Sequence, residues 1–347
     1  MRSVIGHSPV VSLLTRALES GTMAQAYLLC GPPRVGKMTL ARKMAQALNC
    51  DSPARPCGQC AACQRVQSAN HSDVQVIRLE PPKDAEDRSK TEIGIDRIKD
   101  MLHSASLPPF EGRHKVFIVD GAELMSTDAA NALLKTLEEP AARTVFILLA
   151  VNDRLLPETV RSRCQRLELS PVGAPAIEAA LRQRGIEETR ARLLARLAHG
   201  APGWAFSAAA DDGLLAARRE DLEMLARLLD GGYEARFNLA GQLAGRFGQR
   251  RGEVYDLLAL WLDYWHDLLL VKVGCADFVT NIDYLAALEA YCQGYHLDQV
   301  REGLGAVRQA AERLRLNASP RLVFEVMMLD IPLKGATGGP GPAERYG

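Results

Sequence analysis

Short apolar runs alternate with amphipathic stretches over residues 1–165, which is the pattern of a parallel sheet covered by helices. Four of the runs are too short for a helix and predict buried strands: Ala26–Cys30, Val74–Leu79, Lys115–Val119 and Thr144–Ala150. Between them, the helical spacing of apolar residues predicts three helices: Lys37–Leu48, Ile95–Leu102 and Asp128–Glu139. Ser126 or Thr127 is expected to cap the last helix and Pro140 to end it. This half of the chain therefore predicts an α/β fold.

The strand signal fades from about Ser170, where the composition shifts to Ala, Leu, Arg and Glu. Breaks at His199–Gly203 and Asp230–Gly232 separate groups of predicted helices. Farther on, Trp261 and Trp265 belong to a stripe of apolar residues at helical spacing, which predicts a helix core rather than a binding site. The expected domains are an α/β core at 1–168, a small helical domain at 169–211, a larger helical domain at 212–333 and a disordered tail at 334–347.

The composition of the chain narrows the range of functions that it can have. The 42 Lys and Arg residues equal the 42 Asp and Glu residues in number, so no whole-chain basic field attracts nucleic acid. Aromatic residues make up only 5%, which disfavours a single-strand binder built on stacked rings. The N-terminal stretch predicts neither a signal peptide nor a membrane span. We expect a cytoplasmic protein, in which the eight cysteines are thiols or metal ligands.

A phosphate-binding loop is the first candidate site. Gly31–Thr39 follows a predicted strand and opens a predicted helix, which is the context that such a loop requires. The backbone amides between Gly31 and Gly36 would surround phosphate oxygens, and Lys37 would reach the β- and γ-phosphates of ATP or ADP. The segment therefore predicts descent from a nucleotide-binding fold.

The residues for hydrolysis are incomplete. Met38 stands where a Ser or Thr would bind Mg²⁺, and Thr39 lies about 100° farther around the helix. Asp120 ends a predicted strand and suits the Mg²⁺ shell, but Gly121 replaces the glutamate that would polarise the attacking water. Glu123, two residues on, is expected to point elsewhere. The pattern predicts a site in which nucleotide turnover is lost and nucleotide binding is doubtful.

A metal site is the second candidate. Four cysteines occur within fourteen residues that are rich in turn-forming types, with the spacing C-x6-C-x2-C-x2-C: Cys50, Cys57, Cys60 and Cys63. Four thiolates close a tetrahedral zinc site and leave no position for water. We therefore expect a structural Zn²⁺ ion that holds together an insertion after the predicted helix Lys37–Leu48.

Taken together, these segments resemble the clamp-loader branch of the AAA+ family, which includes the gamma/tau and delta prime subunits of bacterial DNA polymerase III. The resemblance covers about residues 1–210 and is carried by the cysteine insertion, by Asp128–Pro140 and by Leu156–Cys164. It implies that Arg163, in Ser-Arg-Cys, acts as an arginine finger on the ATP of an adjacent subunit. It also implies that Asn152 lies near the family's sensor position and that Val4–His7 forms the adenine side of the nucleotide site.

Departures from the motor subunits indicate which kind of member this is. Met38 and Gly121 replace the hydroxyl and the glutamate, and Gly203 stands where a motor has an arginine in its lid. The chain also ends soon after its third predicted domain, whereas a tau-type motor has a long extension. The resemblance therefore implies a non-hydrolysing stator of the delta prime type, with an AAA+ module, a helical lid and a helical collar.

Such a subunit would have no ATPase activity by itself, as a non-catalytic part of the DNA polymerase III holoenzyme. It would join gamma/tau and delta subunits in a pentameric ring that loads the sliding clamp onto primed DNA, without contact to a membrane. Two alternatives stay open: an ATP-hydrolysing motor of the gamma/tau type and a zinc-stabilised DNA-binding adaptor. The motor predicts turnover that depends on Lys37 and Asp120, and the adaptor predicts tight DNA binding without ring assembly.

Overall fold

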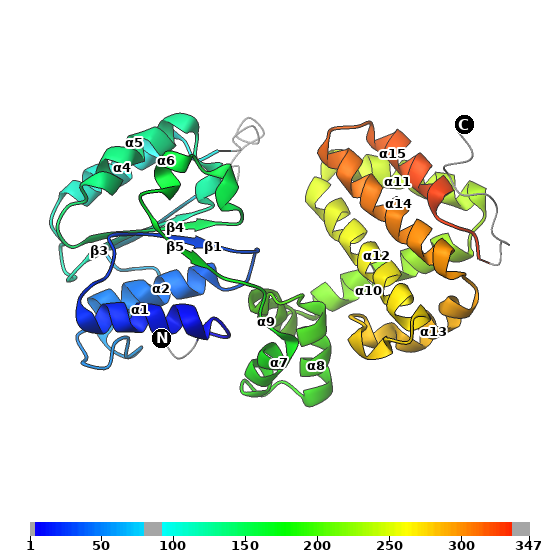
Figure 1. Ribbon diagram of the computed structural model, residues 1–347, viewed down its shortest axis with the longest axis horizontal. Coiled ribbons are helices and arrows are strands. Elements are labelled where there is room, and N and C mark those ends of the chain that lie inside the picture. Colours follow the sequence, from blue (N-terminus) through cyan, green and yellow to red (C-terminus); the bar gives the residue numbers. More distant parts are fainter. Residues whose placement is uncertain (1–3, 80–91, 335–347) are drawn as a thin grey trace. The chain divides into compact units, whose positions relative to one another are not determined.

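The computed structural model describes residues 4–79 and 92–334 of the chain (Figure 1). These residues form two compact units. One unit extends to Ala191 and includes Ala198–Phe206, and the other comprises Arg192–Leu197 together with the described residues from Ser207 onward.

A five-stranded parallel sheet with the order β2-β3-β4-β1-β5 forms the centre of the first unit. Its strands are β1 (Ala26–Cys30), β2 (Val74–Arg78), β3 (Lys115–Asp120), β4 (Thr144–Ala150) and β5 (Gln165–Glu168). All four strands predicted from apolar runs are confirmed, to within one residue at their ends. Strand β5 was missed, because only Leu167 of its four residues is buried and no apolar run marks it.

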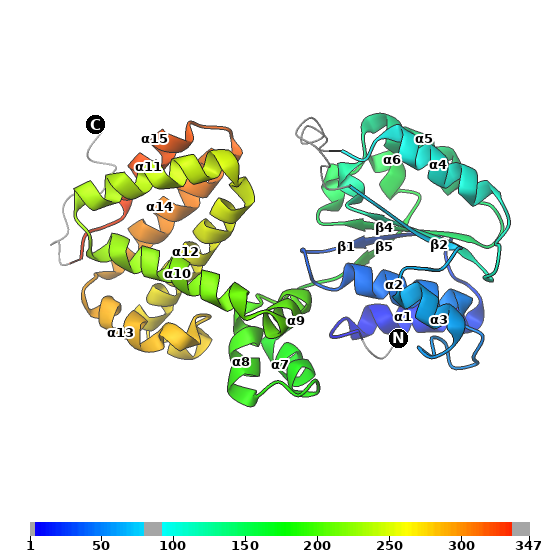
Figure 2. The ribbon, with the colours of Figure 1, turned by 180° about the vertical axis from the view of Figure 1, so that it is seen from behind.

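Helices cover both faces of this sheet (Figures 1 and 2). One face carries α1 (Ser8–Ser20), α2 (Lys37–Asn49) and α3 (Ala61–Gln67), and the other carries α4 (Ile95–Ser106), α5 (Thr127–Glu138) and α6 (Glu158–Arg161). Because both faces are covered, the three inner strands β1, β3 and β4 are buried along almost their whole length. Phe117 of β3 stacks on Phe146 of β4 at a ring distance of 5.4 Å.

The three predicted helices of this half are confirmed. The Ser126 hydroxyl accepts a hydrogen bond from the Ala129 amide at 3.2 Å, so Ser126 is the N-cap of α5. Among the described residues of this unit, 3-10 turns follow the ends of β3 and β4, namely η2 (Ala122–Leu124) and η3 (Asp153–Leu155).

Beyond β5 every regular element of the described residues is helical. The α-helices are α7 (Ala174–Arg182), α8 (Glu188–Leu197), α9 (Pro202–Ala210), α10 (Asp212–Asp230), α11 (Tyr233–Gln249), α12 (Arg251–Lys272), α13 (Leu285–Gln293), α14 (Leu297–Arg315) and α15 (Pro320–Asp330), with 3-10 turns η4 (Ala276–Phe278) and η5 (Ile282–Tyr284). None of the described helices is long and apolar enough to cross a membrane.

The core of the second unit forms around α12. Trp261 and Trp265 are fully buried in it, which confirms the predicted core stripe. The Trp265 ring meets Tyr295 edge to face at 5.6 Å and also fills the space beside Gly303 of α14, where a Cβ atom would come within 2.6 Å of the indole. Of the tail predicted at 334–347, only Lys334 is among the described residues, and residues 335–347, on which the prediction of disorder depends, lie outside them.

Candidate functional site

The loop between β1 and α2 has the backbone of a phosphate-binding turn. Gly31 and Gly36 have φ angles of 151° and 117°, which favour glycine, and Arg34 between them also has a positive φ of 58°. A Cβ atom on Gly31 would lie 2.2 Å from the carbonyl oxygen of Leu169. Glycine at position 31 is therefore required by both the backbone conformation and the close approach of the chain after β5.

Lys37, the first residue of α2, is only 9% exposed. Its Nζ donates hydrogen bonds to the carbonyl oxygens of Gly31 and Pro32, the latter at 2.8 Å. Burial lowers the pKa of the Lys37 ammonium, while the charges of Glu123 and Asp120 act against that shift. The lysine is thus engaged by the carbonyl groups of its own loop, and a phosphate group would have to compete with them.

The other predicted nucleotide-site residues occupy different surroundings. Asp120 is the last residue of β3, and its charge acts on Lys37. Thr39 is exposed on α2. Asn152 is exposed after β4 and caps η3, where its Oδ1 accepts a hydrogen bond from the Arg154 amide at 3.0 Å.

Glu123 was expected to point elsewhere, and the structure differs. Gly121, with a φ of 79°, begins the 3-10 turn η2 and brings Glu123 back toward the site, where its charge acts on Lys37. Its Oε1 accepts a hydrogen bond from the Val151 amide at 2.9 Å. Its Oε2 is buried and has no hydrogen-bond partner among the described residues. The glycine after Asp120 was the sequence signal for this turn.

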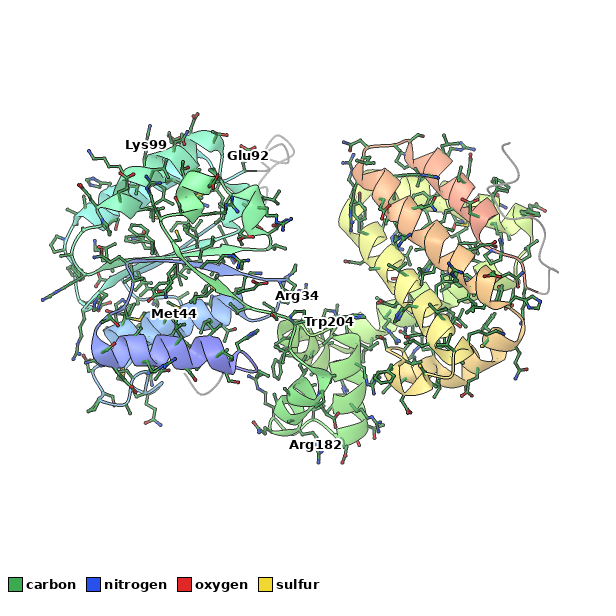
Figure 3. The ribbon with its side chains drawn as sticks, in the orientation of Figure 1. Arg34, Met44, Glu92, Lys99, Arg182 and Trp204 are labelled. Carbon is green, nitrogen blue, oxygen red and sulfur yellow. The ribbon has the colours of Figure 1, made fainter. Side chains whose placement is uncertain are left out.

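The start of α9 lies against the phosphate loop. The Gly203 amide donates to the Arg34 carbonyl oxygen at 3.0 Å, and a Cβ atom at position 203 would come within 2.9 Å of that oxygen. Figure 3 shows Arg34 and Trp204, the residue after Gly203, close together. His7 also contacts the loop, through Nε2 at 3.2 Å from the Val35 carbonyl oxygen.

A depression of about 330 Å³ lies beside His7. It is lined by residues of the N-terminal segment and of the chain after β5: Gly6, His7, Pro9, Val10, Glu168, Ser170, Pro171, Val172, Gly173 and Ala176. The segment that includes Gly6 and His7 therefore lies next to both the phosphate loop and a hollow surface.

The four cysteines of the predicted metal site converge. All four Sγ atoms lie within 4.8 Å of one another, and Cys50 and Cys60 Sγ are 3.9 Å apart. Backbone amides donate to the sulfurs, for example from Cys57 to Cys50 Sγ at 3.4 Å and from Cys60 to Cys57 Sγ at 3.3 Å. Such donors stabilise thiolates, which are the form that binds a metal.

The pKa values of these thiols follow their surroundings. Hydrogen bonds from the amides of Cys60 and Gln59 lower the pKa of Cys57 to about 6, while burial raises the pKa of Cys63 to about 12. Gln46 of α2 donates to the Cys63 carbonyl oxygen at 2.7 Å and so joins the cluster to the sheet-covering helix. Four converging sulfurs fit a tetrahedral metal ion with thiolate preference, as Zn²⁺ has.

Arg163 lies after α6, and its guanidinium is bound within the chain. Nε donates to Glu138 Oε1 at 2.8 Å, and a second nitrogen of the same group, NH2, donates to the same oxygen. The third nitrogen, NH1, donates to the Thr159 carbonyl oxygen at 2.8 Å and contacts Ser162 Oγ at 3.4 Å. The sequence did not predict the contact with Glu138, since the two residues are 25 positions apart.

Comparison with known proteins identifies a matching family model and several relatives in sequence. Residues 6–173 match a family model described as "DNA polymerase III, delta subunit". The chain is 27% identical to Bacillus subtilis DNA polymerase III subunit delta' over 321 residues, which cover 92% of the chain and 94% of that relative. It is 26% identical to B. subtilis subunit tau over 94% of the chain and 60% of the relative, so it spans less than two thirds of that protein.

The Escherichia coli subunit tau is 35% identical over 205 residues, which cover 57% of the chain and 30% of the relative. Among solved structures, a Thermotoga maritima protein related to the gamma subunit matches with a TM-score of 0.41 and 16% identity, over 92% of this chain and 98% of that one. The T. maritima RuvB branch-migration motor matches with a TM-score of 0.42 and 18% identity, over 71% and 76%. Residues 6–173 thus match a DNA polymerase III delta subunit domain, and the homologues of the chain include the delta' and tau/gamma subunits of the clamp-loader family.

Proposed function

We propose that this chain is a non-hydrolysing clamp-loader subunit of the delta' type, which supports ATP turnover in a neighbouring subunit without turning over ATP itself. The observation that carries the proposal is the contact between Gly203 and the phosphate loop. Because the Gly203 backbone packs on the Arg34 carbonyl oxygen, position 203 leaves no room for the arginine that a motor subunit directs at its nucleotide.

Three further features of the site support the same reading. Lys37 is engaged by Gly31 and Pro32, so phosphate binding would cost two existing hydrogen bonds. Met38 offers a thioether where Mg²⁺ prefers an oxygen ligand. Glu123 uses one carboxylate oxygen to bind the Val151 amide, and no glutamate follows Asp120 directly. ATP or ADP with Mg²⁺ is therefore a doubtful ligand of this chain.

In the proposed assembly the work of the chain is structural and allosteric. Arg163 would stabilise negative charge on ATP held by a gamma/tau-type neighbour in a pentameric ring that also contains a delta-type subunit. The ring would load the sliding clamp onto primed DNA in the cytoplasm. Within the chain, residues 169–211 would form the lid of the AAA+ module and residues 212–333 the collar that assembles the ring.

The cysteine cluster has a structural role in this proposal. Cys50, Cys57, Cys60 and Cys63 would hold one Zn²⁺, which would supply no reaction chemistry because four sulfurs complete its coordination. The ion would fix the insertion between α2 and α3 against the sheet.

The first experiment is steady-state ATP turnover by the purified chain with Mg²⁺, with and without primed DNA. We expect no turnover above that of a Lys37→Ala variant. Lys43→Ala, which removes a lysine from the same helix outside the phosphate loop, is the matched control. Turnover that Lys37→Ala abolishes and Lys43→Ala leaves intact would identify the chain as a gamma/tau-type motor and refute the proposal.

The second experiment addresses Arg163 in the reconstituted ring. Removal of an arginine finger lowers turnover by about 10³-fold or more at the site that it serves, so Arg163→Ala should strongly reduce the DNA-stimulated ATPase of the ring. Arg182→Ala, which removes an exposed arginine of α7 (labelled in Figure 3), should leave it unchanged. Unchanged turnover with Arg163→Ala would exclude the finger role.

A further inference from the structure

The guanidinium of Arg163 is occupied on the edge that best recognises phosphate. Arginine binds carboxylate or phosphate oxygens side-on, through Nε–H and one N–H of a terminal nitrogen, or end-on, through both terminal nitrogens. Glu138 Oε1 accepts from Nε at 2.8 Å and also from NH2, so the side-on edge is taken by Glu138. The end-on edge is partly taken as well, since NH1 donates to the Thr159 carbonyl oxygen.

The ion pair lies at the surface. The Arg163 side chain is 34% exposed and that of Glu138 is 49% exposed, so solvent screens the pair and its net strength is small. A nucleoside triphosphate carries several negative charges and has more oxygen atoms that accept hydrogen bonds than one carboxylate has. Phosphates that reach Arg163 would therefore displace Glu138, whereas in their absence the carboxylate holds the guanidinium.

The position of Glu138 in its helix supports this arrangement. Glu138 is the last residue of α5, where the partial negative charge of the helix end disfavours a carboxylate. Glu139 follows it directly and adds a second negative charge. Arg163 offsets this local excess of negative charge, so α5 favours the state in which the arginine is bound to it.

We propose that Glu138 is a positioning residue for Arg163, which holds the guanidinium against the end of α5 until phosphates of a neighbouring subunit's nucleotide compete for the same N–H groups. This inference rests on the proposed role of Arg163 as a finger. In the resting ring, the Glu138 contact then opposes binding of Arg163 to phosphate. When the neighbouring subunit's nucleotide reaches Arg163, its phosphates replace Glu138 as the partner of the guanidinium.

The test uses the reconstituted ring with Glu138→Gln, which removes the charge and keeps an oxygen acceptor of the same length. Because the lost ion pair is exposed and of ordinary strength, we expect the ATPase rate of the ring without DNA, at saturating ATP, to rise about two- to fivefold in this variant. DNA-stimulated turnover should change less, because phosphates already hold the finger in that state. Glu139→Gln, which removes the adjacent charge but no hydrogen bond to Arg163, should raise DNA-free turnover by less than Glu138→Gln does.

A double variant separates this inference from the finger proposal. Glu138→Gln in an Arg163→Ala background should have no effect on turnover, since the carboxylate acts only through Arg163. If Arg163→Ala lowers turnover but Glu138→Gln leaves DNA-free turnover unchanged or lowers it, the finger role stands and the holding role is overturned. If Arg163→Ala has no effect, both are overturned. Equal thermal unfolding of Glu138→Gln and the wild type excludes a folding defect as the cause.

Discussion

His114 lies where β3 begins, with three arginine side chains close enough to act on it. Burial lowers its pKa, and the positive charges of Arg143, Arg55 and Arg113 lower it further. The Leu48 carbonyl oxygen, 3.3 Å from Nδ1, acts in the opposite direction without reversing the shift. Burial and these charges therefore favour the neutral imidazole in the folded protein.

This environment predicts a pH dependence of stability. Because the folded pKa of His114 lies below its unfolded value of about 6.5, the unfolded chain binds the proton more readily. The contribution of His114 to stability is thus fully present above about pH 6.5 and is lost as the pH falls through the folded pKa. We expect His114→Gln to lose less stability than the wild type between about pH 7.5 and 5.

Urea unfolding across this pH range measures the effect. His103→Gln, at an exposed histidine of α4, is the control and should keep the wild-type pH dependence. Titration of the cysteine cluster affects all three proteins equally, so the difference between variants isolates His114. Parallel curves for His114→Gln and the wild type would contradict the prediction.

For single residues, the sequence identified which residue types make up the site better than it identified their hydrogen-bond partners. The loop motif singled out Gly31 and Gly36, and the backbone at both positions has the positive φ that favours glycine. It did not predict that Lys37 turns back onto its own loop or that Glu138 binds Arg163. Such contacts depend on tertiary packing, which brings together residues that no short motif contains.

At the scale of elements, strands were predictable where an apolar run marks them, which includes β2 at one edge of the sheet but not β5 at the other edge. Strand β4 is buried at every position and appears in the sequence as a continuous apolar run. Strand β5 pairs on one side only, through β1, and Leu167 is the one apolar residue among its four. The cysteine spacing predicted convergence of four sulfurs correctly, because Gly58, with a φ of 76°, and the other turn-forming residues between Cys50 and Cys63 fold the segment back on itself.

Metal removal should act on one element of the first unit. The cluster joins the end of α2 to the start of α3, and Cys60 is the N-cap of α3. We expect one zinc ion per chain, and chelation should speed amide hydrogen exchange in residues 57–67 by at least about tenfold while α10–α15 keep their exchange rates. Mass spectrometry of exchange with and without chelator measures this.

Cys57→Ser should reproduce the effect of chelation, because it removes one of four ligands. Cys275→Ser, which removes a cysteine outside the cluster, should bind zinc and exchange as the wild type does. Zinc-independent exchange throughout residues 57–67 would show that the cluster folds without metal.

At the scale of the whole molecule, each unit has a core of its own. In the second unit, Arg236 of α11 is fully buried and binds backbone carbonyl oxygens at the end of α15, those of Met328 and Pro332 at 3.1 Å each and that of Ile331. These carbonyl groups would otherwise be unpaired at the helix end. In the first unit, Gly31 has a comparable structural role, because the chain after β5 leaves no room for a Cβ atom.

Substitutions at these two positions should therefore affect different unfolding transitions. Arg236→Met removes the donors to several carbonyl groups and should cost about 2 kcal/mol or more, which lowers the midpoint of one calorimetric transition by roughly 4–8 °C. Gly31→Ala strains the backbone and creates a clash, which should cost a similar amount and lower the midpoint of the other. Gly21→Ala, with a positive φ but open space around its Cβ position, should lower that second midpoint by less. A single transition that both Arg236→Met and Gly31→Ala shift would show that the two units unfold together.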